Sequence, residues 1–238
     1  KLSEAKYSSM IEGMDKSLND LMNYLDDKGI ADNTIVLFMS DNGGFSLRPR
    51  AGEQHTHNKP LNSGKGSAYE GGIREPMIVK WPGKVKPKTK CDDYLIIEDF
   101  FPTILEMAGV SDYETVQAID GKSFVPMLMQ TGTTAEGRNL YWHFPNNWGP
   151  TGPGIGATST VRSGDWKLIY YYHNQRSELF NIADDIGEKN NLADRNPEKA
   201  NELEQKLGEY LRSVDAQRPS FNKNGQLISW PDQTSISG

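Results

Sequence analysis

Apolar residues near the start of the chain follow the spacing of an amphipathic helix. Between Tyr7 and Leu25 they recur at intervals of three and four positions, which places them along one face of a helix. Gly29 follows the last of them, at a position where a glycine commonly ends a helix. The pattern therefore predicts a helix that buries one apolar stripe and ends before Gly29.

Two short apolar runs, residues 34–40 and 76–81, predict β-strands. The first is apolar at nearly every position, which is typical of a strand covered on both faces, in a mainly parallel sheet flanked by helices. About thirty residues rich in Gly, Asn, His and Lys separate the runs, and loops of this length are usually functional. Residues 96–108 predict another helix, ended by Gly109. This order of elements indicates an α/β fold.

The second half of the chain has a different pattern. Residues 157–173 and 177–182 are short runs of aromatic and β-branched residues, separated by polar turns, and they predict an antiparallel meander. Asn196 and Pro197 suit the first positions of a helix. Residues 110–156 are expected to be irregular, and the last twenty residues to be a polar tail. The apolar face of the predicted helix consists of Ala200, Leu203, Leu207, Tyr210, Leu211 and Val214.

These elements predict two parts, an α/β part over residues 1–130 and a small antiparallel sheet packed with one helix over residues 131–238. In the whole chain of 238 residues, 36% are hydrophobic and 24% are charged, and the net charge of −6 gives no reason to expect nucleic-acid binding. No apolar segment has the length that a membrane span needs. Because Cys91 is the single cysteine, a disulfide framework within the chain is excluded.

The strand at residues 34–40 ends on Asp41 and Asn42, followed by two glycines. In open α/β sheets, ligands bind beyond the carboxyl ends of the strands. A carboxylate and an amide oxygen are hard donors that suit Ca²⁺ or Mg²⁺. An Asx turn explains the same residues without a ligand. Two donors also fall short of the roughly six to eight oxygens that Ca²⁺ prefers, so most ligands of such a site would come from elsewhere.

Lys65 lies between two glycines in the following loop. The stretch is not a phosphate-binding P-loop, because Lys59 and Gly66 stand where that motif needs a glycine and a serine or threonine. A lysine ammonium in such a loop suits a point-charge contact to a sulfate or phosphate group. A solvated loop lysine is the alternative. We expect this loop and the Asp41–Asn42 turn to belong to one site.

Other candidate residues are less specific. Glu70 and Arg74 frame a glycine turn and are expected to form a mutual salt bridge that shapes it. His55 and His57 lie on a polar loop, where they ligate a metal, donate to a ligand or are idle surface histidines. His143 lies among aromatic residues, either at an edge that stacks on a sugar ring or packed in the core.

Taken in order and spacing, four stretches resemble the C-terminal half of the sulfatase family, within the alkaline-phosphatase-like superfamily. Ile186 stands where a recurrent turn of the family, D-P-x-E-x-x-N-L, usually has proline. The resemblance covers nearly the whole chain. The stretches are NTIVLFMSDNGG, LNSGKGSAYEGGIREPMIVKWPG, DFFPTILEMAG and VRSGDWKLIYYY followed by SELFNIADDIGEKNNLA.

The resemblance implies that Asp41 and Asn42 are two ligands of an active-site Ca²⁺, with Mg²⁺ as the alternative, and that Lys65 contacts the sulfate group. His57 and His143 would be further contacts to substrate. The nucleophile of the family is a formylglycine made from a C/S-x-P-x-R motif, and Cys91 is followed by neither the proline nor the arginine. We therefore expect a C-terminal portion that is inactive without the N-terminal half of the same protein.

The same resemblance implies an exported bacterial protein, periplasmic or extracellular, that hydrolyses sulfate esters. Aromatic residues from 141 to 148 favour a sulfated carbohydrate over other sulfated small molecules. A phosphatase or phosphodiesterase of the same superfamily is an alternative, although four histidines without metal-ligand spacing count against its usual metal pairs. A non-enzymatic carbohydrate-binding module, stacking sugars on Tyr141, Trp142 and Trp148, is another.

Overall fold

The computed structural model describes residues 2–45, 58–146, 152–221 and 224–234, and the chain forms two compact units. The first comprises Lys1–Ser40 and Pro76–Glu136, and the second comprises Asp41–Glu75 and Gly137–Gly238. The predicted boundary at residue 130 lies near the end of the first unit. The long loop, however, groups with the C-terminal sheet and not with the two strands that flank it in sequence. The division into domains itself stays a prediction.

The first unit begins with the predicted helix, α1 (Leu2–Asp27), followed by Gly29 with a positive φ of 65°. Its apolar stripe is not buried as expected, since Met10 is 71% exposed and Leu21 is 49% exposed. Leu25, near the C-terminal end of the helix, is buried. An amphipathic pattern shows only that a helix can bury one face, and the described residues leave most of this face uncovered.

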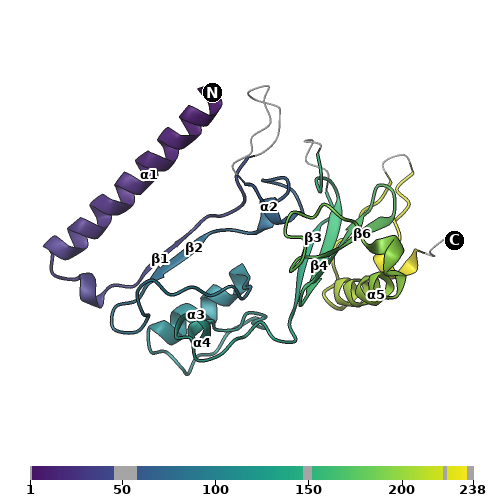
Figure 1. Ribbon diagram of the computed structural model, residues 1–238. Coiled ribbons are helices and arrows are strands. Elements are labelled where there is room, and N and C mark those ends of the chain that lie inside the picture. Colours follow the sequence, from purple (N-terminus) through teal and green to yellow (C-terminus); the bar gives the residue numbers. More distant parts are fainter. Residues whose placement is uncertain (1, 46–57, 147–151, 222–223, 235–238) are drawn as a thin grey trace. The chain divides into compact units, whose positions relative to one another are not determined.

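Strands β1 (Val36–Met39) and β2 (Met77–Lys80) form a two-stranded ladder in the first unit. They run antiparallel, with Leu37 opposite Val79 (Figure 1). The α/β class is confirmed, but within the described residues this pair shows no parallel neighbour, whereas a mainly parallel sheet was expected. Apolar content records how far a strand is buried and does not record the direction of its partner.

Short helices complete the first unit. The predicted helix at residues 96–108 is confirmed as the 3₁₀ turn η2 (Ile97–Asp99) and α3 (Phe100–Met107), while α4 (Val125–Leu128) was not predicted. The core of the unit combines residues from these helices with residues from both strands. Its members are Phe100, Phe124 and Met127, with Leu37, Met77, Leu95 and Leu128 packed around them.

The second unit contains the predicted antiparallel meander, extended by one strand. The strand order is β3-β4-β5-β6, and every neighbouring pair is antiparallel. The first strand lies in the part that was expected to be irregular. The strands are β3 (Asn139–Phe144), β4 (Thr158–Ser163), β5 (Trp166–Tyr171) and β6 (Arg176–Asn181).

One face of this sheet is covered by helix α5 (Pro197–Ser213), which follows the 3₁₀ turn η3 (Ala193–Arg195) (Figure 1). The helix and its apolar face are confirmed except at Val214, which is 51% exposed. The expected polar tail is wrong, because Ile228 and Trp230 are buried in the same core before the 3₁₀ turn η4 (Pro231–Gln233). Sheet residues Leu168, Tyr170 and Leu179 meet helix residues Leu203, Leu207 and Leu211 in this core.

The opposite face of the sheet is buried as well. Ile169, Tyr171 and Phe180 point to this side, where they pack with Tyr69 from the long loop. Neighbouring positions of a strand face opposite sides, so a strand buried on both faces reads as an unbroken apolar run, as residues 168–172 do. The loop therefore acts as the second cover of the sheet.

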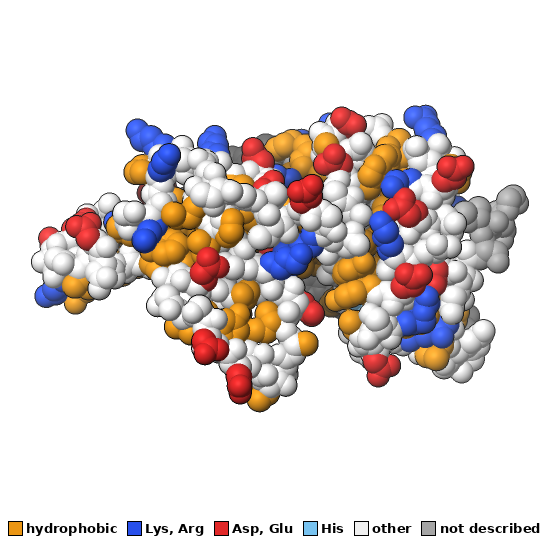
Figure 2. Space-filling model, turned by 90° about the horizontal axis from the view of Figure 1, so that it is seen from below, with side chains coloured by type: hydrophobic (Ala, Val, Ile, Leu, Met, Phe, Trp, Pro, Cys, Tyr) orange, Lys and Arg blue, Asp and Glu red, His pale blue; other side chains and the backbone are white. Residues whose placement is uncertain are grey.

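Charged side chains of both signs lie among hydrophobic ones on the face drawn in Figure 2, as they do along the sequence. No helix within the described part of the chain combines the length and apolar character that a membrane span requires.

Candidate functional site

Three glycines bring the turn after β1 against the loop that contains α2 (Glu70–Ile73). The N–H of Gly43 donates to the carbonyl of Gly72 at 3.2 Å. A Cβ atom added to Gly43 would lie 1.8 Å from the carbonyl oxygen of Gly71, and one added to Gly71 would lie 2.2 Å from that of Asn62. The two glycine-rich motifs thus touch through their main chains, at a distance that no side chain permits.

The turn that carries Lys65 also contacts the main chain that follows β1. The Lys65 N–H donates to the carbonyl of Gly44 at 3.1 Å. The side chain of Asn58 donates to the carbonyls of Gly44, at 2.7 Å, and Ser63, at 3.0 Å. Lys65 itself is exposed, so its ammonium is accessible to a ligand. The structure therefore brings together the Asp41–Asn42 turn and Lys65, as the sequence analysis expected, although their chemical roles stay predictions.

The Asp41–Asn42 turn has a negative character. The Asn42 amide donates to the Asp41 carboxylate, and Asp41 is exposed. Burial, together with the charge of Asp41, raises the pKa of the nearby Glu75 to about 7. Two oxygen donors are of the type that a hard cation prefers, but they supply only part of its coordination. Within the described residues, no group of three or more His, Cys, Asp or Glu side chains is arranged to hold a metal ion.

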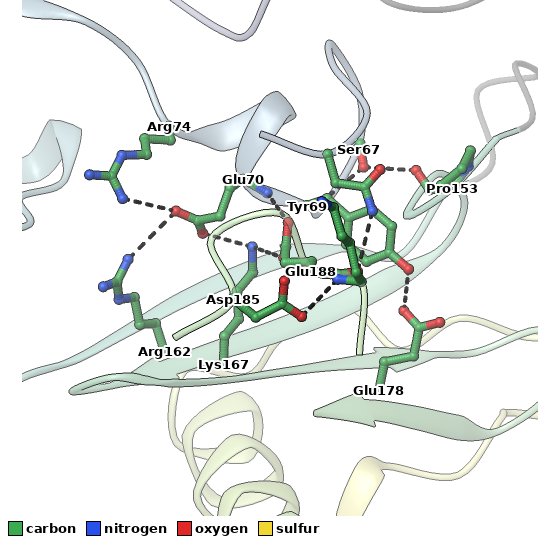
Figure 3. A network of polar contacts seen from close by, with 12 residues as sticks. Ser67, Tyr69, Glu70, Arg74, Pro153, Arg162, Lys167, Glu178, Asp185 and Glu188 are labelled. Carbon is green, nitrogen blue, oxygen red and sulfur yellow. Dashed lines mark hydrogen bonds and ion pairs between the residues drawn. The ribbon is translucent and has the colours of Figure 1, made fainter. Parts of the chain in front are cut away.

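A buried cluster of charges lies beneath this loop (Figure 3). The ammonium of Lys167, at the start of β5, lies 2.9 Å from Glu70 Oε1 and 2.8 Å from Glu188 Oε1. The other oxygen of Glu70 faces Arg74 and Arg162, each at 3.6 Å. The predicted Glu70–Arg74 salt bridge is confirmed, and it is one edge of a larger cluster.

Electrostatics differ between the two carboxylates of this cluster. Burial alone would raise the pKa of Glu70, but the neighbouring Lys167, Arg162 and Arg74 outweigh it and lower that pKa. Burial raises the pKa of Glu188 to about 7, against the opposing effect of Lys167. Glu70 is therefore the anion that the cluster stabilises more strongly.

A second attachment joins the loop to the sheet. The hydroxyls of Tyr69 and Tyr171 both donate to Glu178 Oε2, at 2.6 and 2.7 Å. The hydroxyl of Ser67 donates to the carbonyl of Pro153 at 2.9 Å (Figure 3). Burial and the bond to Glu178 raise the pKa of Tyr69, so it stays a neutral donor. The described part of the loop is thus held by polar contacts at Ser67, Tyr69 and Glu70.

His143 is partly buried at the edge of the C-terminal core, where its ring lies near Tyr172 and Trp230. Its Nδ1 lies 2.7 Å from the hydroxyl of Ser159, and its Nε2 lies 2.8 Å from the carbonyl of Gln217. The ring of Tyr141 stacks on Tyr210, with centroids 3.8 Å apart. These contacts favour the packing interpretation of His143, while its contact to substrate stays a prediction. His55, His57 and Trp148 lie outside the described residues.

Sequence reasoning missed Lys167 and Glu188. A signal for each was present in the sequence. Lys167 interrupts the apolar run of β5, on the side of the strand shared with Ile169. Glu188 is the glutamate of the recurrent turn, and it has a left-handed backbone with φ of 48°. A charged residue inside an apolar strand, and an acid fixed in a turn, are the features from which a buried pair can be inferred.

These features define an α/β protein whose glycine-rich loops bring a carboxylate, an amide and a lysine together over an antiparallel sheet. The family model described as "Sulfatase" matches residues 3–110, and the model described as "N-sulphoglucosamine sulphohydrolase, C-terminal" matches residues 64–217. The second match covers more than half of the chain. The chain belongs to the sulfatase family.

Relatives and solved structures agree with this assignment. A sulfatase of Formosa agariphila is 32% identical over 98% of this chain and 44% of its own length. The crystal structure of Ps i-CgsB in complex with k-i-k-neocarrahexaose has a TM-score of 0.72 and 28% identity, over 90% of this chain and 44% of that chain. The structure of BT4656 in complex with its substrate D-glucosamine-2-N,6-O-disulfate has a TM-score of 0.66 and 27% identity, over 94% and 41%. The chain thus spans less than half the length of these proteins.

Replacing Gly43 with alanine is expected to separate the two motifs. The added Cβ would overlap the Gly71 carbonyl, so the main chain must move, at a cost of about 1–3 kcal/mol. Gly13→Ala is the matched control, because nothing lies within 4 Å of a Cβ there and alanine favours the helix. Thermal unfolding and amide exchange at Gly43 report the change. A Gly43→Ala chain as stable and as protected as wild type would contradict the contact.

Proposed function

We propose that this chain forms part of the active site of a sulfuric ester hydrolase that acts on sulfated carbohydrates. The observation that carries the proposal is the interlocking of the turn after β1 with the Lys65 loop, within a chain of the sulfatase family. The main chain after Asp41 and Asn42 contacts the main chain at Lys65, and this supports assigning the three residues to one site. Such a pairing of a cation site with a cationic side chain suits a substrate that carries a sulfate group.

Lys65 is assigned to the sulfate group. Its ammonium is exposed, while its main-chain N–H is fixed by Gly44. A compact positive charge on a fixed turn can stabilise the negative charge that develops on the sulfate oxygens as the ester bond breaks. The fixed main chain anchors the base of this side chain, and the exposed stem lets the ammonium reach a sulfate group.

Asp41 and Asn42 are assigned to a Ca²⁺ site, with Mg²⁺ as the alternative. Their oxygen donors fit a hard cation. Two donors do not complete such a site, so its remaining ligands belong to the rest of the protein. Asp41 and Asn42 would hold the divalent cation, which, when bound, would supply polarisation of the sulfate group.

The nucleophile is assigned to the part of the protein outside this chain. Cys91 lacks the proline and arginine of the formylglycine motif. The proposed partner of this chain is therefore the N-terminal half of the same protein. An exported location, periplasmic or extracellular, completes the proposal.

A sulfated carbohydrate is the proposed substrate class. Ps i-CgsB holds a neocarrahexaose, and BT4656 holds a disulfated glucosamine as its substrate. The family model that matches most of this chain is described by a sulphoglucosamine activity. These three descriptions support a sugar as the substrate.

We expect the isolated chain to hydrolyse no sulfate ester. It contributes a charged loop and part of a cation site but has no formylglycine motif. The measurement is release of the phenol from an aryl sulfate, with and without millimolar Ca²⁺. Turnover above the buffer rate would contradict the assignment of the nucleophile to another segment.

We expect Asp41→Ala to remove the response of the full-length protein to Ca²⁺. A cation that binds only the folded state raises the Tm in proportion to RT ln(1 + [Ca²⁺]/Kd), so losing one ligand reduces the rise. Asp93→Ala removes an exposed carboxylate elsewhere and should leave the rise intact. The assignment fails if Ca²⁺ stabilises the Asp41→Ala protein as much as wild type.

We expect Lys65→Ala to lower the rate of sulfate release about 10²- to 10³-fold, because a charge that stabilises the transition state is lost. The assay uses the full-length protein, prepared with a formylglycine-generating system, on a panel of sulfated sugars. Lys84→Ala removes an exposed lysine from the first unit and serves as the control. A near-normal rate for Lys65→Ala would refute the role of this lysine.

A further inference from the structure

The sheet of the second unit carries a lysine on a buried face. Along β5, Leu168 and Tyr170 pack against α5, so Lys167 and Ile169 point to the opposite side. Ile169 packs there with Tyr69 of the loop, and the side chain of Lys167 is 0% exposed. A lysine rarely occupies such a place unless it is paired, so its partners indicate its role.

We propose that Lys167 is a positioning residue for the candidate site. Through Glu70 and Glu188 it fixes the segment of residues 61–72 to the sheet, and this segment carries Lys65. The catalytic consequence rests on the function proposed above, whereas the attachment itself does not.

The first step is a closed ring of three groups. The Lys167 ammonium contacts Glu70 Oε1 at 2.9 Å and Glu188 Oε1 at 2.8 Å. The second oxygen of Glu188 accepts the main-chain N–H of Glu70 at 2.6 Å (Figure 3). Both the side chain and the main chain of Glu70 are therefore held, which fixes the start of α2 relative to β5.

The second step leads from this ring to the turn after β1. The carbonyl of Glu188 accepts a hydrogen bond from the Asn62 side chain at 3.4 Å. The carbonyl of Asn62 accepts the N–H of Gly71 at 2.9 Å, and the carbonyl of Gly72 accepts the N–H of Gly43 at 3.2 Å. The last two contacts lie between main chains, at glycines that have no side chain, so a shift of α2 displaces the turn as well.

An apolar side chain of the same size could fill the space of Lys167 but could not neutralise the carboxylates beside it. Without Lys167, Glu70 and Glu188 are left as two buried carboxylates whose nearest common cation is gone. Glu70 keeps Arg74 and Arg162 at 3.6 Å, whereas Glu188 loses the ion pair with Lys167, and a buried carboxylate without its cation draws its segment toward solvent. Loss of an apolar side chain on the other face of β5 leaves no such force on the loop.

The test compares Lys167→Met with Leu168→Ala in the full-length protein. Both change a buried side chain of β5. Lys167→Met removes the charge on the loop side, whereas Leu168→Ala removes apolar atoms on the side that faces α5. We expect Lys167→Met to speed amide exchange in residues 61–72 and to lower kcat/KM about 10- to 100-fold, as expected for a displaced catalytic group. Leu168→Ala should lower the Tm while leaving exchange in this segment and kcat/KM unchanged. Adding Glu188→Gln to Lys167→Met removes the carboxylate that has lost its ion pair, and it should restore part of the protection from exchange and part of kcat/KM.

Amide exchange tests the attachment of residues 61–72 to the sheet, and kcat/KM tests the positioning role of Lys167. Unchanged exchange of residues 61–72 in Lys167→Met overturns the attachment, whether or not the protein hydrolyses sulfate esters. Faster exchange with an unchanged kcat/KM, or an equal loss in Leu168→Ala, overturns the positioning role. If Lys167→Met does not fold, Glu188→Gln alone keeps the shape of the cluster and should give a smaller increase in exchange. Unchanged exchange in that variant also overturns the proposal.

Discussion

An antiparallel sheet that is apolar on both faces must be covered twice, and this requirement organises the second unit. One cover is α5, which presents Leu203, Leu207 and Leu211 to the sheet. The other cover is the long loop, which contributes Tyr69 and the buried start of α2. Because the loop completes this core, it belongs to the same compact unit as the sheet, although β1 and β2 flank it in sequence.

The two covers act differently. The α5 face is mainly apolar, with a partly buried polar contact from Ser177 to Glu204, and the hydrophobic effect that stabilises its packing has no preferred direction. The loop face contains the Lys167 cluster and the two tyrosines on Glu178, whose distances and directions allow one arrangement. A loop that holds chemical groups gains from the second kind of contact, because displacement by an ångström can reduce a rate substantially.

How much the sequence predicts depends on how local each feature is. The limits of α1 and α5, the meander and the Glu70–Arg74 pair follow from spacing within a few residues. The antiparallel pairing of β1 and β2, the exposed stripe of α1 and the buried Ile228 and Trp230 depend on distant partners, which spacing does not specify. The same holds at the site, where glycine-rich motifs indicated a shared location, while the contact of Glu70 with Lys167 joins residues 97 positions apart.

The glycines and the buried charges are two parts of one constraint. Gly43, Gly71 and Gly72 allow main chains to approach until a Cβ at Gly43 would overlap a carbonyl, and such contact transmits small movements directly. A buried ion cluster is weak evidence for stability, since apolar residues of similar volume often do as well. Apolar replacements, however, would let the loop slide on the sheet by a fraction of a side chain. The directional ion pairs of Lys167 prevent this sliding. The main-chain contacts at the glycines then fix the turn of Asp41 and Asn42 relative to the loop.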